Sequence, residues 1–195
     1  PRKDNKSIKN SVFVIENGKI ISIKDKYELP NTGVFDEQRI FKQGSLEDCV
    51  DIKGVKFGLP ICEDIWEKTV LEKLTKSGAE IIIAINASPF TVSKNEERES
   101  VTKLRVKETK LPIVYLNRTG GQDELIFDGS SFALNHDGKK FYNSSEFKEE
   151  TAQISFQKTN GKWAGQGNLN NSSSTTERLY KACLLYTSDA ADDET

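Results

Sequence analysis

The stretch from residue 54 to residue 66, GVKFGLPICEDIW, constrains the fold most, because its hydrophobic period changes at Cys62. Before this cysteine, apolar residues alternate as in a strand with one buried face, at Val55, Phe57, Leu59 and Ile61. After it, apolar residues recur at helical spacing until Gly78 ends the pattern, at Trp66, Val70, Leu71 and Leu74. Cys62 is therefore predicted to lie at a strand-to-helix turn, beside free backbone N–H groups.

Two interpretations of Cys62 follow from its position. A strand-to-helix turn exposes the nucleophile of α/β-hydrolases, although the G-x-S-x-G motif of those enzymes is absent from this sequence. Most cysteines without a disulfide, however, are simply buried side chains of the core. Position alone leaves both interpretations open.

The other segments alternate between strand and helix patterns. Residues 11–16 and 19–24 predict a hairpin about Asn17-Gly18, the strongest short signal for such a turn. The run 79–86, AEIIIAIN, predicts a strand covered on both faces. A charged helix bearing Val101 and Leu104 is expected over 94–110, followed by a strand over 112–117. This alternation indicates an α/β domain.

The sequence pattern of the last third of the chain predicts hairpins and loops. RTGGQDELIFDGSS, 118–131, is expected to be a loop rich in glycine and acidic residues. A second hairpin over 130–135 and 139–142 turns at His136-Asp137-Gly138, and 151–156 is expected to be the last strand. Residues 159–176 read as an arm or linker, and 177–182 begin a helix.

Length and composition narrow the class of protein. The chain has 195 residues, long enough for a domain with a substantial core, and its 35% hydrophobic and 30% charged residues are ordinary for a globular protein. Its formal net charge of −2 indicates neither a nucleic-acid nor a membrane partner, and no apolar run reaches the roughly 18 residues of a membrane span. The polar start without Met predicts a fragment cut at its N-terminus.

Residues 183–194, CLLYTSDAADDE, resemble the translation of a transposon end used in sequencing libraries, and they break the helical pattern that precedes them. We therefore expect 183–195 to be a non-native adapter tail. Without its four acidic residues the net charge changes from −2 to +2. Cys49 and Cys62 then remain without a disulfide framework, which predicts a reducing compartment, the cytoplasm.

Few residue types can activate a cysteine in this chain. A cysteine nucleophile usually relies on a histidine, but the one histidine, His136, reads as a solvated residue of a tight turn. Carboxylates and lysines are the remaining bases. No Cys/His cluster has the spacing of metal ligands, and the GxGxxG and GxxxxGK[ST] phosphate motifs are absent.

Four collinear segments resemble the nitrilase superfamily, whose Glu-Lys-Cys triad cleaves amides and nitriles. They are KYELPNTGVFDEQRIF, GVKFGLPICEDIW, INASPFTVSKNEERE and YLNRTGGQDELIFDGSSF, and they cover most of residues 11–140. The GGQDELIFDG block is most similar to the amide-hydrolysing domains of glutamine-dependent NAD synthetases. The resemblance implies a four-layer αββα sandwich, incomplete at its N-terminus.

The resemblance also implies roles for individual residues. Cys62 is the expected nucleophile, Lys26 the catalytic lysine, and the N–H of Glu63 a second oxyanion donor. The triad's glutamate lies upstream of this region in the family, so the fragment alone is expected to be nearly inactive. Glu37 matches either an accessory carboxylate of the site or a surface salt bridge, and both remain open.

The resemblance further implies how glutamine binds. The positions of Ser88 and Lys94 bind glutamine in the family, and the acidic side chain of Glu63 suits its ammonium group. Trp66 either walls the pocket or belongs to the core. Asp25 stands where the family often has Arg. Thr32 stands where it usually has Tyr, and because this loss removes aromatic contact area, weaker glutamine binding is expected.

These expectations form one leading hypothesis. Residues 1–158 are a partial glutaminase domain without a cofactor or metal, and 159–182 lead to a synthetase domain that uses ATP and Mg²⁺ to convert deamido-NAD to NAD. The whole is expected to be a homo-oligomer. A stand-alone amidase or carbamoylase acting on another small amide is the alternative, and a non-catalytic pseudo-amidase is a third hypothesis.

Overall fold

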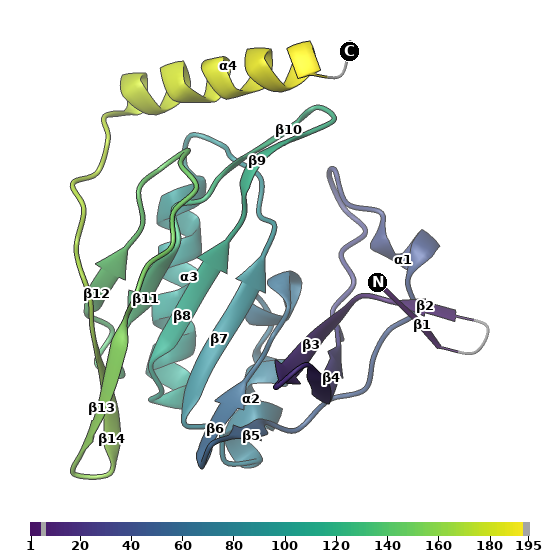
Figure 1. Ribbon diagram of the computed structural model, residues 1–195, viewed down its shortest axis with the longest axis vertical. Coiled ribbons are helices and arrows are strands. Elements are labelled where there is room, and N and C mark those ends of the chain that lie inside the picture. Colours follow the sequence, from purple (N-terminus) through teal and green to yellow (C-terminus); the bar gives the residue numbers. More distant parts are fainter. Residues whose placement is uncertain (5–6, 193–195) are drawn as a thin grey trace. The chain divides into compact units, whose positions relative to one another are not determined.

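The computed structural model describes residues 1–4 and 7–192, which form two compact units, Pro1–Ala84 and Ile85–Thr195 (Figure 1). The chain passes from one unit to the other within β7 (Ile81–Asn86).

Two antiparallel pairs open the first unit: β1 (Arg2–Asp4) with β2 (Ser7–Lys9), and β3 (Ser11–Glu16) with β4 (Lys19–Asp25). The predicted Asn17-Gly18 turn is confirmed, and both of its residues have positive φ angles, 49° and 74°. This is the backbone that a type I′ hairpin turn needs, and glycine adopts it without strain.

A mixed sheet forms the core of this unit. The antiparallel strands β5 (Val50–Ile52) and β6 (Val55–Gly58) are followed by β7, which runs parallel to β6. Helix α2 (Lys68–Lys76) buries one apolar face, and the short helix α1 (Glu37–Ile40) lies earlier in the chain. The buried apolar residues of α2 are those expected from its helical spacing: Val70, Leu71 and Leu74.

The strand before Cys62 is shorter than predicted. It ends at Gly58 instead of Ile61, and both Gly58 and Pro60 are buried, so a single buried face is wrong beyond Phe57. Pro60 has no N–H to donate to a ladder. A side chain at Gly58 would collide with Ile82 and Leu74, which explains why this position is glycine.

The second unit contains α3 (Lys94–Thr109), β8 (Ile113–Asn117), β11 (Phe132–Leu134) and β12 (Lys140–Asn143), with the strands in the order β12-β11-β8. Figure 1 shows α3 lying along one face of β8 and β11, which it contacts. The rings of Tyr115 and Phe132 stack at 5.0 Å in its core. The strand over 112–117 and the hairpin about residues 136–138 are confirmed.

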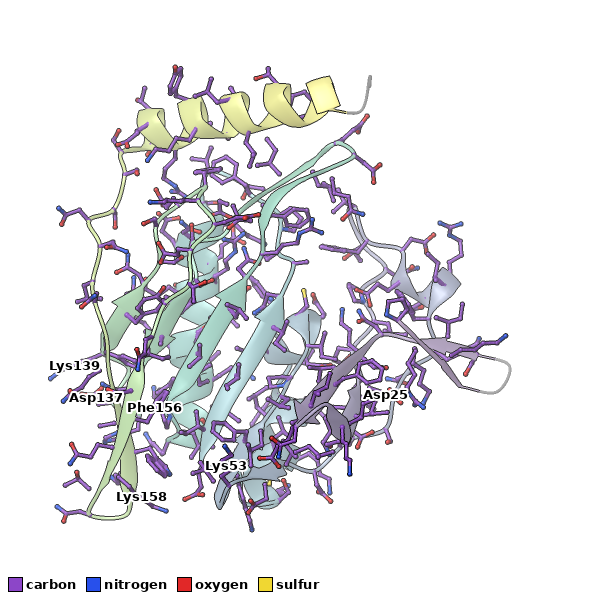
Figure 2. All side chains as sticks on the ribbon, viewed as in Figure 1. Asp25, Lys53, Asp137, Lys139, Phe156 and Lys158 are labelled. Carbon is purple, nitrogen blue, oxygen red and sulfur yellow. The ribbon has the colours of Figure 1, made fainter. Side chains whose placement is uncertain are left out.

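Two segments predicted to be irregular form hairpins. The glycine-rich block 118–131 contains β9 (Thr119–Gln122) and β10 (Leu125–Asp128), paired antiparallel. The last predicted strand is displaced to β13 (Ser155–Thr159), which pairs with β14 (Lys162–Gln166) inside the expected linker. Phe156, labelled in Figure 2, anchors β13 edge-to-face against Phe141, a contact that local sequence cannot reveal.

Two helices have features that the sequence pattern did not reveal. Helix α3 buries Arg98, Thr102, Arg105 and Val106, whereas Leu104 is 46% exposed and Val101 is half-buried. Buried arginines take the place of an apolar stripe on this helix, and the predicted helix over 94–110 is confirmed to within one residue. Helix α4 (Thr175–Asp192) continues through the 183–192 part of the expected adapter tail without a break. The division of the chain at residue 158 and the non-native origin of the tail stay predictions.

Candidate active site

Cys62 lies at the predicted turn, as the first residue of the 3-10 helix η1 (Cys62–Ile65). Its φ angle is 48°, in the left-handed region, where a residue with a side chain is strained by about 1–2 kcal/mol. The side chain is half-buried. Backbone strain of this kind gathers at functional sites because the surrounding structure must maintain it. The turn was predicted; the strain at Cys62 was not.

Lys26 directly follows β4, and its side chain is fully buried. Its Nζ donates a hydrogen bond of 2.6 Å to Oε1 of Glu37, the first residue of α1. The side chain of Glu37 is 17% exposed, so the surface salt bridge considered for it is wrong. Its second oxygen, Oε2, is buried and has no hydrogen-bond partner among the residues that the structure describes.

The backbone holds Lys26 from both sides. Its N–H donates to the carbonyl of Asn10 and its carbonyl accepts from the N–H of Gly44, each at 2.8 Å. A side chain at Gly44 would lie 2.7 Å from the carbonyl oxygen of Asp25, so a glycine is required beside this segment.

Asp25, labelled in Figure 2, closes β4 one residue before Lys26. Arg2 and Ser11 each donate to its carboxylate at 2.6 Å, and Lys9 lies 3.2 Å away. Burial acts to raise the pKa of Asp25, but the hydrogen bonds from Arg2, Ser11 and Lys9 outweigh it and hold the pKa below its ordinary value. The carboxylate therefore stays ionised and ties β1, β2 and β3 to the end of β4.

Asp64 joins the Lys26 segment to the Cys62 turn. Its Oδ1 accepts the N–H groups of Tyr27 and Glu28 at 3.2 and 2.8 Å, and its Oδ2 accepts that of Ile61 at 2.9 Å. Burial raises the pKa of Asp64 to about 6 although these hydrogen bonds and the charge of Lys26 oppose the change. The sequence pattern placed Asp64 only in a helical turn.

The other candidate site residues of the first unit are more exposed to solvent than Lys26 and Asp64. Thr32 is exposed, and its carbonyl accepts the N–H of Phe35 at 3.1 Å. Glu63 and Trp66 are half-buried, and the N–H of Trp66 donates to the carbonyl of Glu63 at 2.9 Å. Trp66 is thus not among the fully buried residues, and its place in a pocket wall stays a prediction.

Ser88 and Lys94 belong to the second unit. Ser88 is buried, and Arg98 donates to its carbonyl oxygen at 2.6 Å and to its Oγ at 3.1 Å. Lys94 opens α3, and its Nζ lies 2.9 Å from Oε2 of Glu97. The structure therefore holds the loop of Ser88 through a buried arginine.

Arg98 is itself fully buried and pairs with Asp128, which is equally buried, at 2.9 Å. Sequence reasoning missed this pair. One signal in the sequence could have revealed it. The helix has few apolar residues, so a charged side chain such as Arg98, four residues after Lys94, had to lie on the face toward the core.

Other expected features have these outcomes. His136 is half-buried, with Nδ1 3.3 Å from the carbonyl of Trp163, so its description as a solvated turn residue is wrong in part. Cys49, Cys62 and Cys183 form no disulfides within the described ranges.

Residues 1–4 and 7–192 contain no group of His, Cys, Asp and Glu side chains placed to hold a metal ion. In the same residues, no helix has both the length and the apolar character of a membrane span.

Curated proteins similar to this chain are glutamine-dependent NAD⁺ synthetases. The one from Acinetobacter baylyi is 44% identical over 142 residues, which are 72% of this chain and 26% of that protein. The one from Synechocystis sp. is 34% identical over 195 residues, which are 94% of this chain and 35% of that protein. The chain thus spans about a quarter to a third of the length of these relatives.

Solved structures are similar as well. Glutamine-dependent NAD⁺ synthetase from Acinetobacter baumannii, in complex with ADP, superimposes with a TM-score of 0.91 and 31% identity, over 98% of this chain and 36% of that one. A carbon-nitrogen hydrolase from Helicobacter pylori matches with a TM-score of 0.72 over 94% of this chain and 62% of that one. At 20% identity it shows the shared fold alone. The nitrilase-like α/β fold class is confirmed.

The family model for carbon-nitrogen hydrolases matches residues 1–164, most of the chain. The match includes the segment of Lys26, the turn of Cys62 and the loop of Ser88. By this match the chain belongs to the carbon-nitrogen hydrolase family.

Proposed function

We propose that this chain is the glutamine-hydrolysing domain of a glutamine-dependent NAD synthetase. The observation that carries the proposal is the strained Cys62 turn, in the same unit as the buried Lys26–Glu37 pair and tied to the Lys26 segment by Asp64. A nucleophile, a buried cation and a carboxylate partner are the parts that amide hydrolysis by a thiolate requires. The names of the relatives supply the substrate.

The proposed reaction begins at the sulfur of Cys62. Its thiolate attacks the side-chain amide carbon of glutamine, and the oxyanion that forms is stabilised by the ammonium of Lys26 and the N–H of Glu63. The C–N bond then breaks as the leaving nitrogen takes up the proton that the thiol gave up, and ammonia departs. Water hydrolyses the thioester to glutamate and the free thiol. Glu37 keeps the ammonium of Lys26 oriented through their 2.6 Å hydrogen bond.

The general base of this mechanism is assigned to none of these residues. In the first unit, Glu63 and Trp66 are proposed to contact glutamine. For Ser88 and Lys94, in the second unit, the same role rests on the family resemblance alone. The Oγ of Ser88 accepts a hydrogen bond from Arg98, and its own O–H can still donate to an acceptor such as a substrate oxygen.

The ammonia is proposed to serve an ATP- and Mg²⁺-dependent synthetase that converts deamido-NAD to NAD. The names of the relatives and the ADP in the Acinetobacter baumannii complex support this partner reaction. Assembly as a homo-oligomer and a location in the cytoplasm are part of the same proposal; the absence of a predicted disulfide framework favours the latter.

Replacement of Cys62 tests the function in the full-length protein to which this chain belongs. Cys62→Ala should abolish glutamine-dependent NAD synthesis and spare ammonia-dependent synthesis. Cys49→Ala is the matched control, because Cys49 donates to the carbonyl of Ser77 at 3.2 Å and has no assigned chemistry; both activities should persist.

Four outcomes would reject the proposal. Loss of both activities in Cys62→Ala would make Cys62 structural, and retention of the glutamine-dependent activity would remove it from the chemistry. A wild-type protein that hydrolyses small amides but not glutamine would instead be a stand-alone amidase or carbamoylase. A protein that hydrolyses neither would be a pseudo-amidase.

A further inference from the structure

Asp64 connects two segments that are distant in sequence. Its carboxylate accepts the N–H of Ile61, next to Cys62, and the N–H groups of Tyr27 and Glu28, next to Lys26. We propose that Asp64 is a positioning residue that sets the placement of the Lys26 ammonium relative to the Cys62 sulfur. This inference rests on the proposed amide hydrolysis and adds to it a residue that touches neither substrate nor the reacting atoms.

A simpler role does not account for these contacts. A helix cap requires Asp64 to accept the N–H of Ile61 alone, as the third residue of η1. The other two N–H groups lie 37 and 36 residues earlier in the chain and follow Lys26 directly. Asp64 therefore serves both the turn of the nucleophile and the segment of the lysine.

The other contacts of Lys26 leave the position of its ammonium dependent on Asp64. Asn10 and Gly44 hold the backbone of Lys26 itself, and Asp64 holds the two residues after it. Because the Lys26 side chain is fully buried and hydrogen-bonded at 2.6 Å, its ammonium can move little unless its backbone moves. Positioning at this scale matters, since a displacement of about 1 Å can reduce a rate about 10²-fold.

The chemistry of the carboxylate makes the proposal testable. An ionised aspartate offers acceptor sites on both oxygens, which three N–H groups occupy here. Asparagine has one acceptor oxygen and one amino group of nearly the same shape. Asp64→Asn can therefore satisfy Ile61 or the Tyr27–Glu28 pair, and it turns a donor toward the other.

The experiment uses the full-length protein with Asp64→Asn and, as a matched control, Asp51→Asn. Asp51, an exposed residue of β5, also accepts a backbone N–H, that of Gly54 at 2.9 Å in the turn to β6. Glutamine hydrolysis, ammonia-dependent synthesis and iodoacetamide alkylation of the Cys62 peptide across pH are measured for each protein. Circular dichroism and thermal unfolding report whether each variant is folded, and ammonia-dependent synthesis reports whether its synthetase activity is intact.

For Asp64→Asn we expect kcat for glutamine hydrolysis to fall about 10²-fold, with KM changed less than about threefold. The pH profile of Cys62 alkylation should move to higher pH, because the thiolate loses the positioned ammonium. Ammonia-dependent synthesis should be retained, and Asp51→Asn should match the wild type in all three measurements. An unchanged kcat, or an unchanged alkylation profile, would overturn the proposal.

Asp64→Glu keeps the inference testable if Asp64→Asn does not fold. It retains both acceptor oxygens but moves them by one methylene, so kcat should fall at least about tenfold while ammonia-dependent synthesis persists. An unchanged kcat in this variant would also overturn the inference. Failure of the proposed function is a separate result, since the wild type itself would then fail to hydrolyse glutamine.

Discussion

Nζ of Lys26 and Oε1 of Glu37 are 2.6 Å apart, and the lysine side chain is completely shielded from solvent. A buried ammonium is tolerated only when a partner compensates its desolvation. Glu37 is this partner, and the opening of α1 presents it. In the proposed mechanism, this pair supplies the cation that a histidine supplies in other cysteine enzymes.

Removing Glu37 should destabilise the protein, because the ammonium of Lys26 is then buried without its partner. We expect Glu37→Ala to lower the free energy of unfolding by about 2–4 kcal/mol in urea denaturation. Arg39→Ala is the control, since its pair with Asp36 is 73% and 54% exposed and should contribute less than about 0.5 kcal/mol. Equal effects of the two substitutions would contradict a buried Lys26–Glu37 pair.

Titration of Asp64 should make stability depend on pH. The folded protein has a pKa of about 6 at Asp64, above the ordinary 3.8, so between these values it binds more protons than the unfolded chain. Stability is therefore lost as pH rises through about 6, by about 3 kcal/mol for a difference of about 2 in pKa. The unfolding free energy of the wild type minus that of Asp64→Asn should fall by most of this amount between pH 4 and pH 7, measured by urea denaturation. A difference independent of pH would exclude the raised pKa.

Arg98 should be the most sensitive charged residue of α3. It donates to Asp128, Asn95, Ser88 and Pro89, and its side chain is fully buried. Arg98→Lys removes the planar fork and should lower the free energy of unfolding by about 3–5 kcal/mol in urea denaturation. Lys103→Ala, on the exposed face of the same helix, should change it by less than about 0.5 kcal/mol. Tolerance of Arg98→Lys would mean that the loop of Ser88 is held by other contacts.

Gly44 should not accept a side chain. The added Cβ of Gly44→Ala would lie 2.7 Å from the carbonyl oxygen of Asp25, and this contact would push the backbone next to Lys26. We expect a loss of about 1–3 kcal/mol in thermal or urea denaturation and a lower kcat for glutamine hydrolysis. Ser45→Ala, at the exposed neighbouring position, is the control and should leave both unchanged. Wild-type activity in Gly44→Ala would show that this contact relaxes without moving Lys26.

Thr32 should weaken glutamine binding by its small size. It is exposed in the turn after Pro30, at the position where the family resemblance expects Tyr. In the full-length protein Thr32→Tyr should lower the KM for glutamine, by about three- to tenfold, because an aromatic side chain adds contact area with the substrate. Steady-state glutaminase kinetics measure this, and kcat should change little. An unchanged KM would remove Thr32 from the substrate contacts.

The hydrophobic period and the turn residues by themselves determined most elements of the fold. Alternating residues and Asn17-Gly18 specified the β3–β4 hairpin, and the change of period at Cys62 specified the turn. These signals are local, because a strand or helix exposes its pattern within a few residues. Motif resemblance then identified Lys26, far from Cys62 in the sequence, as a second candidate, which period and composition could not do.

The tertiary structure decided the electrostatic contacts of the site. Three contacts depend on residues that are far apart in sequence. Glu37 pairs with Lys26, Asp64 accepts N–H groups from both segments, and Arg98 is buried against Asp128. A sequence pattern assigns a charged side chain to the surface, because burial of a charge is unfavourable unless a partner is present. Only the folded chain supplies that partner, so Cys62 was predictable as a candidate nucleophile, whereas the contacts around Lys26 and Asp64 were not.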